Sequence, residues 1–187
     1  MNDQQYRFIR GARILQQLNE ESTYDDLETN ITTSFPTTRK RQHATNEVTI
    51  QHIDIVPYLG TKMMHVRAIS NGSTGRQYQQ AIQFLNVVFN QAKTPENVEF
   101  IASDGKTYYV MPVDLSNHNM KVRCNCLDFY HRFAHWNHTD RSIVGRAPVP
   151  YQRKTTTHPE VNPDHVPGMC KHLIKIVLDL QRRGIIV

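Results

Sequence analysis

Two short stretches decide the fold: Cys124-Asn125-Cys126 and, 43 residues further on, Cys170-Lys171-His172. Together they contain all three cysteines of the 187-residue chain. Three thiolates and one imidazole complete a tetrahedral zinc site and leave no coordination position for a catalytic water. The pattern therefore predicts one structural zinc ion. We call its four expected ligands the Cys/His cluster: Cys124, Cys126, Cys170 and His172.

The spacing within each stretch predicts the backbone that carries the ligands. Side chains alternate along a strand, so Cys-x-Cys at a strand end directs both sulfurs to one face. Cys-x-His cannot converge in mid-helix, because residues i and i+2 lie on nearly opposite sides. It can converge where a helix begins, so we expect Cys170 near the N-cap and His172 in the first turn of a C-terminal helix. Arg123 and Lys171 are expected to offset the negative charge of the site.

Three alternatives to this assignment stay open at the level of sequence. The same residues can hold an iron–sulfur cluster, or they can be buried free thiols, which the paired spacing disfavours. A different histidine can also supply the fourth ligand in place of His172. The candidates are His118, His131, His135, His138, His158 and His165.

Hydrophobic periodicity predicts an α+β fold, with an antiparallel sheet, an N-terminal helix and a C-terminal helix. Apolar residues recur at helical spacing over 5–20, and Ser22 is expected to cap a second short helix. Residues 78–89 fit either a helix or strand pieces, and the flanking strands favour strand. The expected strands lie within 48–57, 64–68, 78–89, 98–101, 107–113 and 120–126.

The domain organisation expected from these elements has two parts. Residues 1–46 form N-terminal helices and an extended arm, and residues 47–187 form a β-rich domain with a zinc-linked C-terminal region. Within that domain the insert, residues 127–169, is a long loop between the two ligand pairs. Its aromatic residues Phe129, Phe133 and Trp136 are expected to pack over the metal. A partner-binding arm is expected at Arg141, Arg146, Tyr151, Arg153 and Lys154, because arginine and tyrosine contribute most at interfaces.

Composition limits the classes of function. The net charge is +5, the sequence pI is about 9.2 and the mean hydropathy is −0.56, which suits an acidic or nucleic-acid partner. We expect no membrane span and no signal peptide, hence synthesis in a cytoplasm. Nucleophile, phosphate-binding and metalloprotease motifs are missing from the sequence, so a non-enzymatic protein is expected.

Two family resemblances follow from the ligand stretches. Cys-x-Cys on a strand, followed by Cys-x-His opening an apolar helix, resembles the SWIM-type zinc finger, whose four ligand positions correspond to the Cys/His cluster. SWIM fingers are associated with DNA binding and protein contacts, but the insert is far longer than theirs. The strings RCNCLDFY (123–130) and VPGMCKHL (166–173) also look like virion-associated structural proteins of tailed bacteriophages, over residues 60–187.

These resemblances imply two functions. The first is a non-enzymatic structural component of a phage virion, in the tail, baseplate or neck. It is made in the host cytoplasm and contacts other virion subunits, in a homo-oligomeric ring or in repeated copies. The alternative is a cytoplasmic SWIM-like module that binds nucleic acid.

Overall fold

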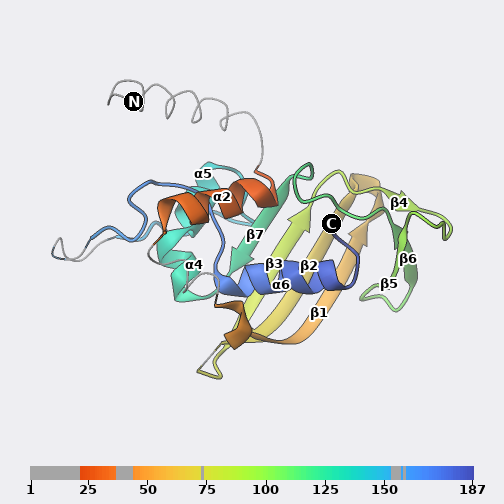
Figure 1. The fold of residues 1–187 in the computed structure, drawn as a ribbon, viewed down its shortest axis with the longest axis horizontal. Helices are drawn as coiled ribbons and strands as arrows, with labels where there is room; N and C mark the ends of the chain where they lie inside the picture. Colours follow the sequence, from red (N-terminus) through yellow and green to blue (C-terminus); the bar gives the residue numbers. More distant parts are fainter. Residues whose placement is uncertain (1–21, 37–43, 73, 153–156, 158) are drawn as a thin grey trace.

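The computed structural model describes residues 22–36, 44–72, 74–152, 157 and 159–187. It confirms the α+β fold, which is built on a four-stranded antiparallel sheet in the order β1-β2-β3-β7 (Figure 1). A second, three-stranded sheet has the order β4-β6-β5. The strands are β1 (Thr49–Tyr58), β2 (Met63–Asn71), β3 (Gln77–Phe84), β4 (Phe89–Asn90), β5 (Val98–Ile101), β6 (Thr107–Val110) and β7 (Met120–Cys124).

Period-two alternation gives the four-stranded sheet one apolar face. The strand registers place Ala68, Gln80 and Cys124 side by side in one inward-facing row. This row lies at the end of the apolar face and carries both a glutamine and a metal-ligand candidate. The two rows beside it are apolar and buried: Val66, Ile82 and Val122, then Met64, Phe84 and Met120.

The C-terminal helix α6 (Lys171–Arg182) crosses this apolar face (Figure 1). Its buried residues recur at three-to-four spacing, as expected for a helix packed along one side. Gly184 follows the helix with a φ of +71°, a conformation that glycine adopts without the steric cost of a side chain. The residues buried against the core include Leu173, Ile176, Val177 and Leu180.

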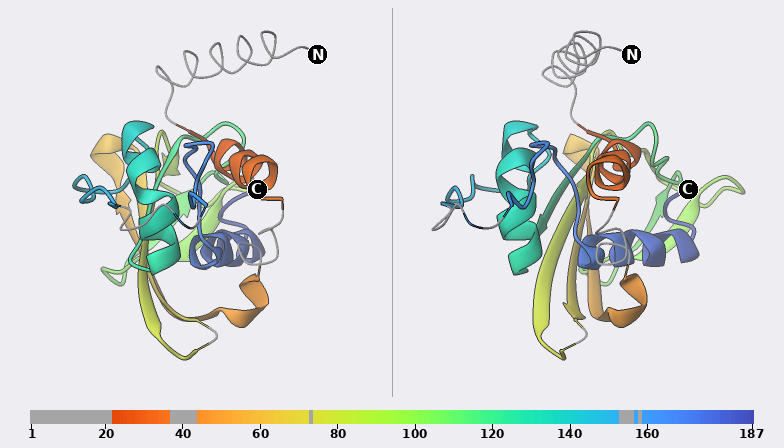
Figure 2. Two further views of the ribbon diagram at one scale, coloured as in Figure 1. Left: turned by 90° about the vertical axis from the view of Figure 1, so that its left-hand side faces the viewer. Right: turned by 60° about the vertical axis from the view of Figure 1, so that its left-hand side comes forward.

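The helix α2 (Tyr24–Ser34) lies on the same side of the sheet as α6 (Figure 2). Its N-cap is Thr23 and not Ser22, which corrects the predicted cap. Thr23 Oγ1 accepts from the backbone N–H of Asp26, and the Asp26 carboxylate accepts from the N–H of Thr23, so the two complete a capping box. Ser22 instead donates its hydroxyl to Asp140 at 2.7 Å.

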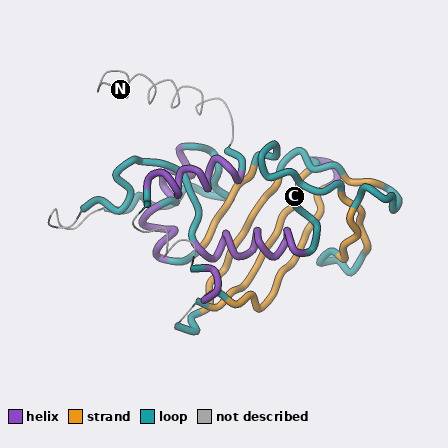
Figure 3. Tube along the Cα trace, viewed as in Figure 1, coloured by secondary structure: helices purple, strands orange, loops and turns teal. Residues whose placement is uncertain are grey.

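The insert begins with two short helices, α4 (Leu127–Arg132) and α5 (Ala134–Thr139), and continues mainly as loop (Figure 3). Beyond α5 the chain returns to the sheet, where Ile143 forms a parallel bridge with Val122 of β7. Single turns of 3₁₀ helix, η1 (Thr45–Glu47) and η2 (Leu59–Thr61), flank β1. The insert is therefore partly folded against the domain.

Most of the expected strands are confirmed. Residues 78–84 lie in β3 and Phe89 begins β4, with an irregular connection over 85–88, so the interpretation as strand pieces is right and the helical one is wrong. Pro57 lies within β1, which is tolerated because β1 is an edge strand.

The helix expected over 5–20 falls outside the described residues. No helix in the described part of the chain has the length and apolarity to cross a bilayer.

Candidate metal centre

The four residues of the Cys/His cluster meet beneath the end of the sheet. Their ligand atoms all lie within 4.8 Å of one another, and all four residues are buried. Nδ1 of His172 lies 3.9 Å from the sulfur of Cys124 and 3.8 Å from that of Cys170. A tetrahedral ion with metal–sulfur bonds of about 2.3 Å has ligand–ligand edges of about 3.6–3.8 Å. The donor set and its dimensions therefore fit one metal ion.

The local backbone around each ligand pair is the one that the spacing predicts: a strand end for Cys-x-Cys and a helix start for Cys-x-His. Cys124 ends β7, and the chain turns at Asn125, whose side-chain oxygen and backbone N–H both bond the backbone of Gln79 on β3. Cys126 is then the N-cap of α4, and Cys170 is the N-cap of α6. His172 lies in the first turn of α6, with Nδ1 facing the sulfurs.

Hydrogen-bond donors around the sulfurs favour the charged thiolate. The Phe129 amide donates to Cys126 at 3.3 Å, and the Cys126 amide donates to Cys124 at 3.5 Å. Burial raises the pKa of the Cys124 and Cys170 thiols, whereas hydrogen bonds from these two thiols lower the pKa of Cys126. Three thiolates can share this buried space only with a cation, so a bound metal ion must displace the remaining thiol protons.

The expected charge compensation by Arg123 and Lys171 is wrong. Alternation along β7 directs Arg123 to the opposite face from Cys124, and its guanidinium bonds the backbone carbonyls of Val144 and Arg146 in the insert. The Lys171 ammonium lies 2.8 Å from the carboxylate of Glu47. The N–H donors near the sulfurs, rather than basic side chains, therefore offset the thiolate charge.

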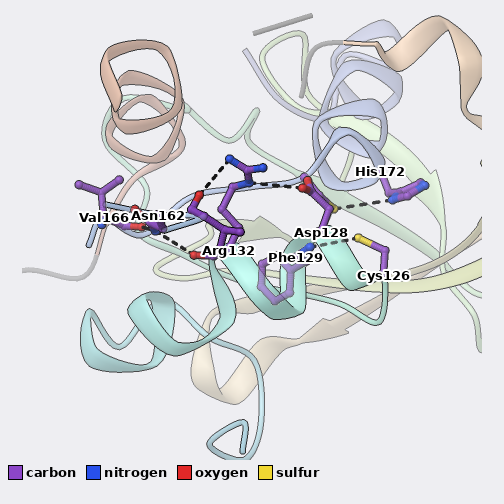
Figure 4. Close-up of polar contacts among 9 residues, drawn as sticks. Cys126, Asp128, Phe129, Arg132, Asn162, Val166 and His172 are labelled. Atoms are coloured by element: carbon purple, nitrogen blue, oxygen red, sulfur yellow. Dashed lines mark hydrogen bonds and ion pairs between the residues drawn. The ribbon is translucent and has the colours of Figure 1, made fainter. Parts of the chain in front are cut away.

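The insert has a second attachment, between α4 and residues 161–169, which lead back to the cluster and which we call the returning segment (Figure 4). The buried guanidinium of Arg132 lies 3.3 Å from the Asp128 carboxylate and donates to the carbonyl of Val161 at 3.1 Å. The side-chain amide of Asn162 donates to the carbonyls of Arg132 and Val166, each at 2.8 Å. These bonds fix the returning segment to α4 without any metal.

The residues just before Cys170 are held by α2 and α5. The Gly168 N–H donates to the Asn137 side-chain oxygen at 3.0 Å, and Asn30 donates to the carbonyl of Pro167 at 3.2 Å. The returning segment thus reaches the cluster along a path that protein contacts define.

The residues predicted for partner binding lie away from the cluster. Arg141, Arg146 and Tyr151 are exposed, whereas Arg153 and Lys154 fall outside the described residues. Val149, in the same stretch, is 76 % exposed. Residues 145–151, which we call the exposed loop, are thus the described part of the insert most open to a partner.

The aromatic residues of the insert divide into two groups. Phe129 and Phe133 are fully buried, as predicted. Trp136 is only partly buried and stacks on His165 with ring centroids 4.2 Å apart, so its expected place over the metal is wrong. Among the described residues no other histidine joins the Cys/His cluster, and His172 is the histidine that the geometry favours.

The sequence pattern assigned no role in the site to Gln80, Arg132 or Asn162. A signal existed for Gln80, because it shares strand parity with Ile82 and Phe84 and so faces the core. Arg132 and Asn162 are 30 residues apart, and no local pattern links them.

Comparison of the chain with protein-family models, with curated proteins and with solved structures gave no significant match. The resemblances to SWIM fingers and to phage virion proteins therefore rest on the quoted residues alone. The assignment of the Cys/His cluster as a metal site rests on the distances between its ligand atoms.

Replacing His172 by alanine is expected to abolish stoichiometric metal binding, because three thiolates without the imidazole leave the tetrahedron incomplete. His138→Ala is the matched control, since His138 is an exposed histidine outside the cluster. Elemental analysis of both purified variants measures the metal content. Retention of one metal ion per chain by the His172 variant would show that the imidazole is not required and that another residue or a water molecule completes the tetrahedron.

Proposed function

We propose that this chain is a non-enzymatic structural protein whose C-terminal half is fixed by one zinc ion in the Cys/His cluster. The observation that carries the proposal is the buried, complete set of three sulfurs and one nitrogen. Such a set has no open position for water or substrate. A multi-iron cluster between the same ligands needs them farther apart than a single ion does, which favours zinc.

The role proposed for the metal is to fix the insert at both of its ends. Cys126 immediately precedes the insert and Cys170 immediately follows it, so one ion closes a loop of 43 residues. Closing a loop in the unfolded chain costs entropy, and a link that holds the ends together stabilises the folded form. With the ends of the insert fixed, the exposed loop, which contains Arg146, Val149 and Tyr151, is held in a defined position from which it can bind a partner.

The partners we propose are other subunits of a tailed-phage virion, present as a ring or as repeated copies. The resemblance of residues 123–130 and 166–173 to virion proteins supports this assignment. Quantitative mass spectrometry of purified particles, together with elemental analysis of the isolated protein, tests it. We expect a fixed copy number in particles and one zinc ion per chain. Absence of the protein from particles contradicts the virion assignment, whereas absence of zinc contradicts the metal assignment.

A SWIM-like nucleic-acid-binding module is the second candidate, supported by the sequence pI near 9.2 and by exposed Arg141 and Arg146. A module of that kind binds DNA with an affinity that falls steeply with salt, because phosphate contacts release counterions. Under the virion proposal we expect no salt-sensitive DNA retention by the purified protein. Under the alternative, retention should fall with salt, and an Arg141→Ala, Arg146→Ala double variant should lower the salt slope by about 2.

A further inference from the structure

Gln80 is a polar side chain in a position that the core would fill with an apolar one. It faces inward from β3, in line with Ile82 and Phe84, and is 4 % exposed. Burying a side-chain amide costs free energy unless its polar atoms are hydrogen-bonded. The Gln80 oxygen has no hydrogen-bond partner among the described residues. Stability of the sheet therefore does not explain a glutamine here.

The nitrogen of the same side-chain amide gives a reason for a glutamine at this position. Gln80 Nε2 lies 3.8 Å from the sulfur of Cys124, its neighbour across the β3–β7 pair, and donates a hydrogen bond to it. The sulfur also accepts from the Cys126 amide at 3.5 Å and faces Nδ1 of His172 at 3.9 Å. Among the described residues, Cys124 is therefore the sulfur that is seen to accept from a side chain outside the Cys/His cluster.

On its Nε2 side, the His172 ring is held by packing rather than by a hydrogen bond to a described residue. Its centroid lies 4.4 Å from that of Tyr78, and a Cβ at Gly72 would come within 3.4 Å of His172 Nε2 and 3.1 Å of the Tyr78 ring. Nε2 is buried and has no partner among the described residues. Tyr78 and Gly72 thus fix the ring orientation, and among the described residues Gln80 is the side chain from outside the cluster that hydrogen-bonds to it.

We propose that Gln80 is a positioning residue for the metal centre: its N–H orients the Cys124 sulfur and stabilises it as the metal-bound thiolate. A hydrogen bond to an ionised acceptor is roughly twice as strong as one between neutral groups, so the bond favours the metal-bound state over the thiol. Partners of this kind typically change metal affinity 10- to 100-fold when they are removed. The inference rests on the proposed metal site.

Gln80→Met tests this role, because methionine keeps an unbranched side chain of similar length and removes the N–H donor and the unpartnered oxygen. We expect zinc affinity, measured by competition with a chromophoric chelator, to fall about tenfold. The thiolate-to-cobalt charge-transfer band of the fully Co²⁺-loaded variant should also shift. Gln79→Leu is the matched control: its side chain is exposed and only its backbone bonds Asn125, so affinity should stay within about twofold.

Three results separate the failure of this inference from the failure of the proposed function. If the wild-type chain binds neither Zn²⁺ nor Co²⁺, the metal site itself fails. If the wild type binds and Gln80→Met binds equally well with an unchanged cobalt spectrum, the role of Gln80 is overturned. A fall in affinity with an unchanged cobalt spectrum also overturns it, because general destabilisation lowers affinity without changing the thiolates of the loaded site.

Discussion

Replacing Cys170 by serine is expected to remove the bound metal and to unfold the C-terminal half of the chain. Structural zinc binding is worth about 10–16 kcal/mol in zinc-finger peptides, whereas a domain is stable by about 5–15 kcal/mol in total. Loss of the ion therefore removes free energy comparable to the whole stability. Cys170 is also fully buried, so a serine hydroxyl there has to be desolvated.

Elemental analysis and amide hydrogen exchange measure the two parts of this expectation. Exchange protection should be lost over α4, α6 and the returning segment of the insert. Chelation of the wild-type protein is the matched control: it should produce the same unprotected segments, and the chelator should have no further effect on the variant. Wild-type stability in a metal-free Cys170→Ser variant is the result that contradicts a stabilising metal.

The sequence predicted those parts of the fold that depend on local periodicity. Alternation at Met64, Val66 and Ala68 predicted β2, whereas residues 78–89 fitted both periods and β3 was predicted from the strands on either side of it. The Cys-x-His spacing, followed by apolar residues at helical spacing, predicted a helix start at Cys170, because residues i and i+2 cannot converge in mid-helix. These are properties of a few neighbouring residues, so they can be seen without knowing the tertiary structure.

The remainder depends on which segments meet in space. Ser22 and Thr23 are both good caps, and the choice of Thr23 follows from the spacing to Asp26, while Ser22 is engaged by Asp140. The orientation of Arg123 was available from strand parity with Cys124, but its carbonyl partners in the insert were not. Long-range pairs of this kind have no sequence period.

The contacts of the insert position the metal ligands in a way that the spacing of the ligands does not predict. Asn162 and Arg132 fix its returning segment to α4 through bonds that do not involve the cluster. A metal site rarely forms before its protein folds, and here the protein contacts already bring Cys170 toward the end of β7. Metal binding and packing should therefore be coupled, so that a packing defect near Cys170 weakens metal binding.

Gly168 is the position where this coupling can be tested without touching a ligand. A Cβ at residue 168 would lie 2.6 and 2.8 Å from two ring carbons of Phe133 and 3.1 Å from Ile31 Cγ1, closer than side chains normally approach. Phe133 and Ile31 are fully buried, and the Phe133 ring packs edge-on against Phe35, so neither can move aside easily. Relief must come from the backbone that leads to Cys170.

Gly168→Ala is accordingly expected to destabilise the metal-loaded protein by about 1–3 kcal/mol, the usual cost of overpacking a core. That corresponds to a fall in Tm of about 2–12 °C for a domain of this size, and displacement of Cys170 should lower zinc affinity in the same variant.

Gly60→Ala is the matched control, because a Cβ there has no atom within 4 Å, and its effect should stay within about 0.5 kcal/mol. Thermal unfolding and chelator competition measure both quantities. If the two variants are equally stable, the returning segment is not tightly packed; if Gly168→Ala loses stability but keeps full zinc affinity, packing and metal binding are independent.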